Sequence, residues 1–200
     1  LKEIKSENGL ISNDNWTLTE DKNGFLYFGT NGNGVSIYNP KEFLVNYNNS
    51  FGFPDDKILS ISEDNFGNKL LGTKTGLIKL NHLNKFSFIK ADDERGNLIN
   101  VLYKKKNGEI LVGTYHGLKI LKNNSLKNFV NDPQIVNNEI YAIAEIGNKI
   151  LVGTYNGVYS IEENHVYKIS YFDNIESNFI ISILPIDSNQ IYFGSFDKGI

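Results

Sequence analysis

Five copies of one short glycine motif, spaced almost evenly along the 200 residues, constrain this chain more than any other feature. Each copy is an apolar run followed by Gly-Thr or Gly-Ser, with a second glycine and an aliphatic residue a few positions later. The first glycines lie 43, 41, 40 and 41 residues apart. Such regularity indicates a repeat architecture, in which each copy is one supersecondary unit. These glycines are Gly29, Gly72, Gly113, Gly153 and Gly194.

The residues around each motif predict four short strands. About 12 residues before the motif lies a short apolar run, as at 58–61, and such runs favour strands over helices. A polar turn such as 64–67 follows, and its glycine supplies the positive φ of a hairpin. A third strand is expected at 35–38 and a more polar fourth at 86–90, 125–130 and 165–170. Four antiparallel strands in about 41 residues predict an all-β chain, a β-propeller segment of four-stranded blades.

Two other architectures fit the sequence less well. A helical repeat would carry helical periodicity over ten or more residues, which is not found because glycine interrupts the sequence too often. A β-sandwich would have hairpins but no repeating Gly-Thr signature. The predicted repeats are 7–48, 49–90, 91–131, 132–172 and an incomplete 173–200.

The two ends of the sequence fall inside predicted blades. Residues 1–6 are expected to form the outer strand of a preceding blade, and the sequence stops where the third strand of the fifth repeat is due. We therefore expect an open arc of blades, with the remaining blades of the same propeller lying outside these residues.

Composition excludes several functions. The net charge is -3 and the basic residues are scattered, so no nucleic-acid surface is indicated. The absence of Cys excludes disulfides and thiolate chemistry and is compatible with an oxidising compartment. No apolar run approaches the roughly 20 residues that span a bilayer. The three histidines occupy non-equivalent repeat positions, so neither a metal nor a cofactor is expected.

The fullest repeat, residues 58–77, has the pattern Ile-x-Ser-Ile-x-Glu-Asp-x-x-Gly-x-x-x-x-Gly-Thr-x-x-Gly-Leu, and residues 16–35 match it nearly as well. This pattern resembles the two-component regulator propeller repeats, which form the periplasmic sensor region of hybrid histidine kinases in Bacteroidota. The resemblance extends over essentially the whole chain. The family often has Trp two residues before the motif glycine, where this chain has Tyr27, Leu70, Leu111, Leu151 and Tyr192.

The resemblance implies a non-catalytic, periplasmic or extracellular ligand-sensing propeller of a two-component receptor. A carbohydrate ligand is expected, together with a homodimer and a membrane anchor in the full-length protein. A propeller scaffold for protein contacts at the cell surface or in a secretion system stays open as an alternative. A propeller lyase or glycosidase also stays open, since inverting glycosidases use two carboxylates and acidic pairs occur at 55–56 and 92–93.

Some polar positions recur in phase with the glycines and are therefore predicted to be structural. The Thr or Ser after each glycine is expected to form a hydrogen bond within the turn. A second set is predicted to form Asx turns, in which the side chain accepts a hydrogen bond from a backbone N–H two residues on. This set is Asn13, Asp56, Asn97, Asn138 and Asn178.

The turns after each Gly-Thr vary from blade to blade, and loops at one end of a propeller usually carry its function. Three of these turns place an aromatic residue beside a polar one, a pairing that suits a sugar ring or a protein contact. Packing of the aromatic rings against the neighbouring blade is the structural alternative. The candidate ligand-binding residues are Tyr115, His116, Tyr155, Asn156, Phe196, Asp197 and Asn31.

Overall fold

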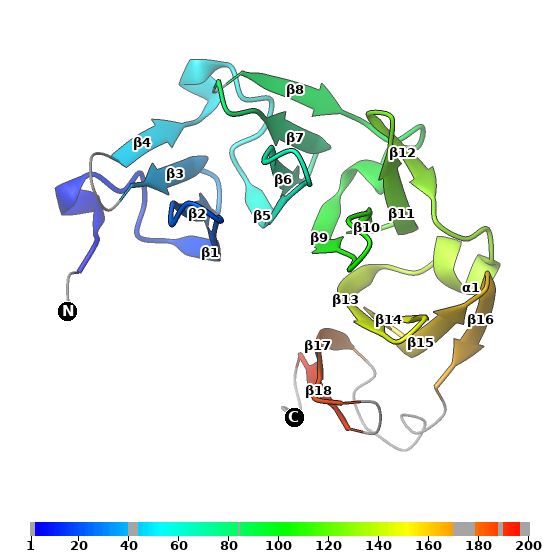
Figure 1. The fold of residues 1–200 in the computed structure, drawn as a ribbon. Helices are drawn as coiled ribbons and strands as arrows, with labels where there is room; N and C mark the ends of the chain where they lie inside the picture. Colours follow the sequence, from blue (N-terminus) through cyan, green and yellow to red (C-terminus); the bar gives the residue numbers. More distant parts are fainter. Residues whose placement is uncertain (1–2, 40–43, 84, 170–178, 188–189, 197–200) are drawn as a thin grey trace.

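The computed structural model describes residues 3–39, 44–83, 85–169, 179–187 and 190–196. It confirms the all-β fold: antiparallel sheets follow one another as blades along an open arc (Figure 1). Four sheets have four strands, and the described part of a fifth has two. Strand order follows the sequence from the inner edge of each blade to its outer edge, so each blade is a simple meander.

The strands fall close to the predicted positions. Blade 1 contains β1 (Asn15–Glu20), β2 (Leu26–Thr30), β3 (Val35–Tyr38) and β4 (Leu44–Tyr47). Blade 2 contains β5 (Ile58–Glu63), β6 (Lys69–Thr73), β7 (Leu77–Leu80) and β8 (Phe86–Ile89). Blade 3 contains β9 (Ile99–Lys104), β10 (Ile110–Thr114), β11 (Gly117–Lys122) and β12 (Ser125–Asn128). Blade 4 contains β13 (Ile140–Ile146), β14 (Lys149–Thr154), β15 (Gly157–Glu162) and β16 (His165–Lys168), and blade 5 contains β17 (Ile180–Pro185) and β18 (Ile191–Ser195).

Within the described residues, helical structure is confined to single turns at the ends and crossovers of the blades. These are η1 (Ser6–Asn8), η2 (Asn49–Phe51), η3 (Arg95–Asn97) and α1 (Pro133–Val136). The expectation of an outer strand at residues 1–6 is wrong for its described part, because residues 3–5 lie in no strand and residue 6 begins η1. A bond from the Lys5 N–H to the Asn8 side chain and the positive φ of Gly9 (110°) favour a local turn there.

The motif glycines are required because the next blade packs directly against them. A Cβ added at any of four motif glycines would come within 2.6 to 2.9 Å of the Cγ2 of the isoleucine that begins the next inner strand. No real Cβ tolerates such a contact without displacing its neighbour. The space beside each motif glycine is therefore filled by the isoleucine side chain of the next blade, and we call the glycine the socket and the isoleucine the knob of this contact. The pairs are Gly29 with Ile58, Gly72 with Ile99, Gly113 with Ile140, and Gly153 with Ile180.

The predicted hydrogen bond of the motif threonines is confirmed in the first four blades. Each hydroxyl is buried and donates to the carbonyl oxygen of the second motif glycine at 2.8 or 2.9 Å. The threonine hydroxyl oxygen in turn accepts a backbone N–H within the turn. The threonines thus close the turn that leads from the second strand to the third. They are Thr30, Thr73, Thr114 and Thr154.

The predicted Asx turns at the second recurring set are wrong. In the first three blades the side-chain oxygen accepts a hydrogen bond from a backbone N–H six or seven residues earlier, and thereby closes the crossover loop between blades. The donor and acceptor residues are Ser6 and Asn13 (2.8 Å), Asn49 and Asp56 (2.7 Å), and Ala91 and Asn97 (2.7 Å).

The fourth member of this set differs again, because α1 occupies its crossover. The Asn138 side chain donates to the carbonyl oxygen of Gln134 at 2.7 Å, which joins it to the end of the short helix. Asn178 lies outside the described residues.

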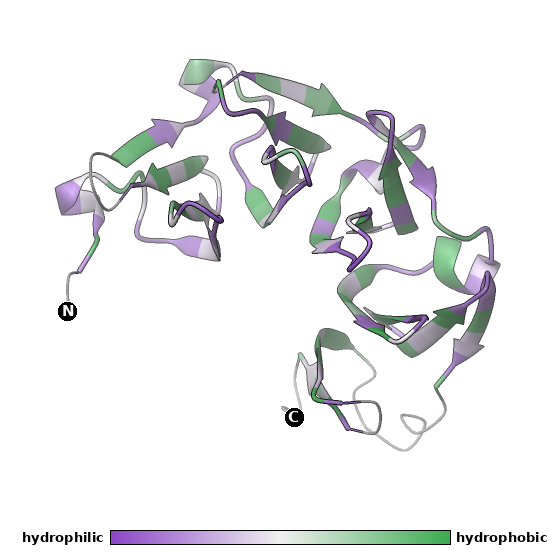
Figure 2. Cartoon of the chain, viewed as in Figure 1, coloured by the Kyte–Doolittle hydropathy of each residue, from purple (hydrophilic) through white to green (hydrophobic). Residues whose placement is uncertain are grey.

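The hydrophobic core consists of separate layers between consecutive blades. One cluster joins blades 1 and 2, a second joins blades 2 and 3, and a third joins blades 3 and 4. Figure 2 shows the same distribution, with hydrophobic residues concentrated on the strands and hydrophilic residues at many turns. Because the strands are used for packing, the turns at the two ends of the blades are available for binding.

Candidate functional site

The turns after the Gly-Thr motifs and the crossovers between blades lie at one end of the propeller, which we call the turn face. It comprises the turns 31–33, 74–75, 115–116 and 155–156 and the crossovers 48–57, 90–98 and 129–139. Backbone hydrogen bonds join the two kinds of segment. The Gly34 N–H donates to the carbonyl oxygen of Asp56 at 2.8 Å, and the Gly117 N–H donates to the carbonyl oxygen of Asn138 at 2.9 Å.

Five aromatic rings form a continuous row across the turn face of blades 3 to 5. Neighbouring ring centroids lie 4.6 to 6.1 Å apart, within the range of edge-to-face and offset-stacked pairs. Phe179 is central, since its ring contacts three of the others. We call this set the aromatic row: Tyr115, Tyr141, Phe179, Tyr155 and Phe196.

The row is partly embedded and partly open to solvent. Tyr155 is 59% exposed and Phe196 is 69% exposed, whereas Tyr115, Tyr141 and Phe179 are half-buried. The half-buried ring of Phe179 contacts both exposed rings and thereby supports them. An exposed ring that is held by neighbouring rings can stack on the apolar face of a ligand with little loss of side-chain entropy.

Hydrogen-bonding groups accompany the aromatic row. The Asn156 amide N–H group donates to the Asn138 side-chain oxygen at 2.9 Å, which fixes this exposed residue beside Tyr155. The Tyr141 hydroxyl donates to the Glu139 carboxylate. Burial, reinforced by hydrogen bonds to Glu139 and Tyr115, raises the pKa of Tyr141, so this hydroxyl stays protonated and remains a donor at neutral pH.

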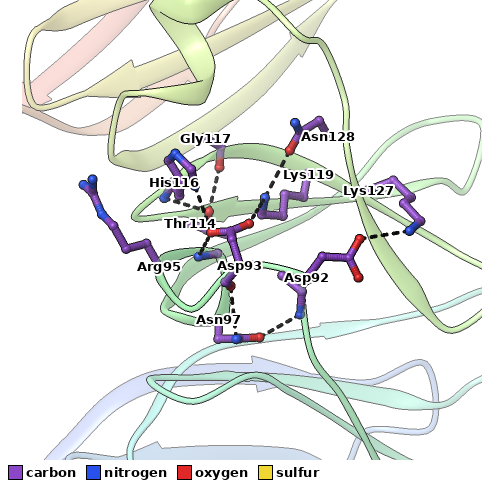
Figure 3. Close-up of polar contacts among 12 residues, drawn as sticks. Asp92, Asp93, Arg95, Asn97, Thr114, His116, Gly117, Lys119, Lys127 and Asn128 are labelled. Carbon is purple, nitrogen blue, oxygen red and sulfur yellow. Dashed lines mark hydrogen bonds and ion pairs between the residues drawn. The ribbon is translucent and has the colours of Figure 1, made fainter.

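A polar cluster adjoins the aromatic row at Tyr115 and is centred on Asp93, in the crossover from blade 2 to blade 3 (Figure 3). One carboxylate oxygen of Asp93 lies 2.8 Å from His116 Nδ1, and the other lies 2.9 Å from Lys119 Nζ. Lys119 Nζ also donates to the Asn128 side-chain oxygen at 3.1 Å, and its side chain is only 4% exposed.

Two further hydrogen bonds, both from residues of η3, fix Asp93 in the polar cluster. The Gly96 N–H donates to Asp93, and the Asn97 amide donates to the Asp93 carbonyl oxygen at 3.2 Å. Burial alone would raise the pKa of Asp93, but hydrogen bonds from Lys119 and His116 outweigh it and lower that pKa to about 2. Asp93 is therefore ionised at neutral pH, and it neutralises the buried ammonium of Lys119.

The structure brings together five of the candidate residues that the sequence indicated. Tyr115, Tyr155 and Phe196 belong to the aromatic row, and His116 belongs to the polar cluster beside it. Asn156 accompanies Tyr155. Asn31 follows β2 in blade 1, two blades before the turn of Tyr115, and pairs there with Lys57 of the next crossover. Asp197 lies outside the described residues.

Sequence reasoning missed Tyr141, Phe179 and Asp93. Tyr141 is the second residue of β13, and Phe179 directly precedes β17. Only blade 1 has an aromatic residue equivalent to Tyr141, namely Trp16 at the bulge of its inner strand. No other repeat has an aromatic residue at the position of Phe179, so the sequence shows no repeating pattern there. Asp93 was noted only as one of an acidic pair in a loop. The signal that could have found Asp93 is the buried Lys119, which alternation along the third strand of blade 3 places inside a blade and which therefore requires a carboxylate.

Within the described residues, no group of three or more acidic, His or Cys side chains is arranged to hold a metal ion. None of the helices in these residues has the length and apolar character needed to cross a membrane.

Comparisons with known proteins follow the fold and the repeat. Residues 9–32 match the family model described as two component regulator propeller, which confirms the resemblance to that repeat family. No curated protein sequence matches this one.

Several solved structures share the fold. The extracellular domain of the hybrid two component system BT3049 from B. thetaiotaomicron matches with a TM-score of 0.80 at 22% identity, over 96% of this chain and 27% of that one. The extracellular domain of BT4673 from B. thetaiotaomicron matches with a TM-score of 0.73 at 24% identity, over 91% and 26%. Virginiamycin B lyase from Staphylococcus aureus, crystallised as a catalytically inactive variant with quinupristin, matches with a TM-score of 0.68 at 14% identity, over 88% and 61%. The chain thus spans about a quarter of the length of the two sensor domains.

Proposed function

We propose that this chain is a non-catalytic, ligand-sensing propeller segment of a hybrid two-component signalling receptor. The match of residues 9–32 to the two component regulator propeller model supports this assignment, and so does the likeness to extracellular domains of such systems. In such a receptor the segment lies outside the cytoplasm, joins further blades of the same propeller, and signals as a homodimer through a membrane anchor and a kinase elsewhere in the protein.

The ligand that fits the turn face best is a carbohydrate. The observation that carries this proposal is the aromatic row, in which Tyr155 and Phe196 are exposed and the amide of Asn156 directly follows Tyr155. A sugar has an apolar ring face that stacks on an aromatic side chain and hydroxyl groups that need donors and acceptors at its edge. The polar cluster around Asp93 and His116 extends these hydrogen-bonding groups along the same face.

Calorimetric titration with plant and host oligosaccharides tests the proposal when wild type and Tyr155→Ala are compared. Loss of the stacking surface should weaken binding by about 1 kcal/mol beyond the buried area of the ring. Tyr167→Ala is the matched control, since Tyr167 is 57% exposed but lies on the outer strand β16. Binding that is equally weakened in both variants, or in neither, would contradict a site at the aromatic row.

Thermal melts of the same variants separate binding from folding. Tyr155→Ala should leave the melting temperature nearly unchanged, because the turn is set by Thr154 and Gly157. Gly153→Val should lower it, because a Cβ there would meet Ile180 at 2.8 Å. If Tyr155→Ala lowers the melting temperature as much as Gly153→Val, the ring is a packing residue and the site is wrong.

An enzyme on this scaffold makes a different prediction for the same experiment. The pair of His116 and Asp93, 2.8 Å apart, is an arrangement that general-base catalysis can use. A lyase or glycosidase would consume the bound oligosaccharide, so chromatography of the ligand after titration distinguishes the two functions. The sensor requires the ligand to be recovered intact.

A further inference from the structure

The interface between blades 1 and 2 contains a lysine where the other blades carry an aliphatic residue. Three residues before the motif glycine stands Lys69, and the equivalent residues are Leu26, Ile110, Ile150 and Ile191. The side chain of Lys69 is only 7% exposed. Its ammonium lies 3.1 Å from Asp21 of blade 1 and 2.8 Å from Glu63 of its own blade. It also lies 5.1 Å from the ring centroid of Tyr27.

A cleft opens above this buried ion cluster, at the end of the blades opposite to the turn face. We call this end the hairpin face; it comprises the turns 21–25, 64–68, 81–83 and 123–124. The cleft has a volume of about 390 Å³ and is lined by residues of both blades. This volume lies within the range of small-molecule sites in proteins, roughly 300 to 1,000 Å³.

Part of the cleft wall is apolar and is held in place. Phe25, Val45 and Leu80 contribute aliphatic or aromatic surface. The ring of Tyr47 is stacked on Phe53 with 5.7 Å between ring centroids, so its position in the wall is fixed. A preformed wall of this kind offers a ligand stacking surface without a large entropy loss.

The rim of the cleft carries amide and imidazole groups whose hydrogen-bonding capacity is not fully used by the described residues. The Asn81 side-chain oxygen accepts the backbone N–H groups of Leu83 and Lys85, but among the described residues nothing accepts from its NH₂ group. The side chains of Asn23 and His82 also line the cleft and form no side-chain hydrogen bond with the described residues. These groups offer donors and acceptors to a hydroxylated ligand.

The charges near the cleft cancel. Asp21 is saturated, because its oxygens accept the N–H groups of Asn23 and Phe25, the Tyr27 hydroxyl and the Lys69 ammonium. The carboxylates of Asp21 and Glu63 face the ammonium of Lys69, and a second ammonium, that of Lys22, lies near Gly67 at the cleft. These charges sum to zero, so a charged ligand would leave the site with a net charge.

We propose that the cleft between blades 1 and 2 binds a small neutral molecule with hydroxyl groups and one apolar face, of the size of a single hexose ring. Its apolar face packs on the wall formed by Phe25 and Tyr47, and its hydroxyls bond to Asn23, Asn81 and His82. This site is separate from the aromatic row, which lies on the turn face of blades 3 to 5.

An NMR titration with three hexose-sized probes tests both the site and the chemical class. Glucose is neutral, glucosamine is cationic and glucuronate is anionic. Glucose should shift the side-chain amide signals of Asn23 and Asn81 and the ring signals of His82. The charged probes should shift the same signals with affinities about tenfold weaker, because each leaves a charge unpaired. Shifts confined to Asn156 on the turn face, or tighter binding of a charged probe, would overturn the proposal.

Val45→Trp provides the decisive variant, because Val45 lines the cleft but is no member of the ion cluster, so a larger side chain on β4 fills the space without removing an ionic group. Ser87→Trp is the matched control, since Ser87 occupies the same register on the outer strand of blade 2: Val45 pairs with Ile37, and Ser87 with Lys79. Glucose should shift the cleft signals in Ser87→Trp but not in Val45→Trp, with both variants melting near the wild-type temperature. Shifts that persist in Val45→Trp would place the ligand elsewhere, and the absence of shifts in wild type would overturn the site.

Discussion

The interface between blades 1 and 2 and the interface between blades 3 and 4 share one strand register but differ in chemistry. At the position three residues before the motif glycine, blade 2 has Lys69 and blade 4 has Ile150. Lys69 joins two carboxylates in a nearly dry setting. Ile150 is 4% exposed and belongs to an aliphatic cluster with Leu111 and Val152.

The glutamates that pair with these two residues also differ in their contacts between the two interfaces. Glu63 and Glu145 pair with Lys69 and Ile150 respectively in their hairpins, so they are equivalent. Glu63 binds the lysine, whereas Glu145 accepts the backbone N–H of Lys106 across the interface at 2.8 Å. The register therefore decides which positions meet between blades, and the side chains at those positions decide whether the contact is ionic or apolar.

The largest effect is expected when the lysine is removed from the ionic interface. Lys69→Met keeps most of the volume but leaves Asp21 and Glu63 without a counter-charge, and breaking a buried pair in this way costs about 3–5 kcal/mol. Ile150→Met at the apolar interface is nearly volume-conserving and should cost less than about 1.5 kcal/mol. Urea unfolding of both variants measures the difference. Equal decreases in the free energy of unfolding would show that the ion cluster is no more sensitive to substitution than an aliphatic contact.

A smaller effect, equal at the two interfaces, is expected at the shared knob-and-socket contact. Gly29→Ala and Gly113→Ala each place a Cβ within 3 Å of the isoleucine of the next blade, and overpacking of this kind costs about 1–3 kcal/mol. The free energy of unfolding from urea titration should fall by similar amounts in both. A large loss at only one glycine would mean that the two sockets are not equivalent.

Acid should loosen the ionic interface before the apolar one. Burial of Asp21 alone would raise its pKa, but hydrogen bonds from Phe25 and Lys69 outweigh it and hold the pKa below the ordinary value of 3.8. A carboxyl group whose pKa is lower in the folded than in the unfolded protein stabilises the fold at pH values above 3.8. This contribution is lost as the pH falls through the pKa of the folded state. The pKa of Lys69 is raised: burial opposes this shift, and the bonds to Glu63 and Asp21 outweigh it. The Lys69 contribution is therefore present throughout the acid range and is lost only above pH 10.5.

Hydrogen exchange of backbone amides, corrected for the intrinsic rate, measures this order of loosening. Below about pH 4, protection should fall in β2 and β6 while it persists in β10 and β14. Asp21→Asn should remove part of the difference between the two interfaces. Simultaneous loss of protection in all four strands would contradict a local effect.

The smallest effect is expected at the second of the two equivalent glutamates. Glu145→Gln keeps an oxygen that accepts the Lys106 N–H, so the free energy of unfolding should fall by less than about 1 kcal/mol. Glu63→Gln loses a charge-assisted bond to a buried ammonium and should cost about 1.5–3 kcal/mol. A loss from Glu145→Gln as large as that from Glu63→Gln would remove the distinction between the interfaces.

Much of the fold could be predicted from the sequence because its strongest constraints repeat. The spacing of the glycines from Gly29 to Gly153 reflects the contact with the isoleucine of the next blade, and each threonine closes the turn as expected. The Asx prediction failed for a physical reason. A short side chain such as that of Asn97 can accept from any N–H that the loop brings near it, and the sequence does not specify the path of an irregular crossover.

The binding residues were only partly predictable because they do not repeat. The variable turns located Tyr115 and Tyr155, but Phe179, which joins them into one row, occupies a position where no other repeat has an aromatic residue. Lys69 looked like an ordinary polar residue in a strand. Its burial depends on Asp21, 48 residues earlier in the sequence, and only the packing of two blades brings these residues together.

The knob-and-socket contact has a direction along the chain, because the glycine of one blade contacts the isoleucine of the next. This direction determines how further blades can be added to the arc. Isoleucine and glycine occur in the same repeat, so one copied unit carries the complement for the blade before it and for the blade after it. A tandem duplication in frame with the repeat period inserts a unit that fits at both ends, whereas a duplication out of phase separates the two halves of the contact. Gene duplication can therefore lengthen such an arc one blade at a time without inventing a new interface, and divergence can then alter residues such as Lys69 one interface at a time.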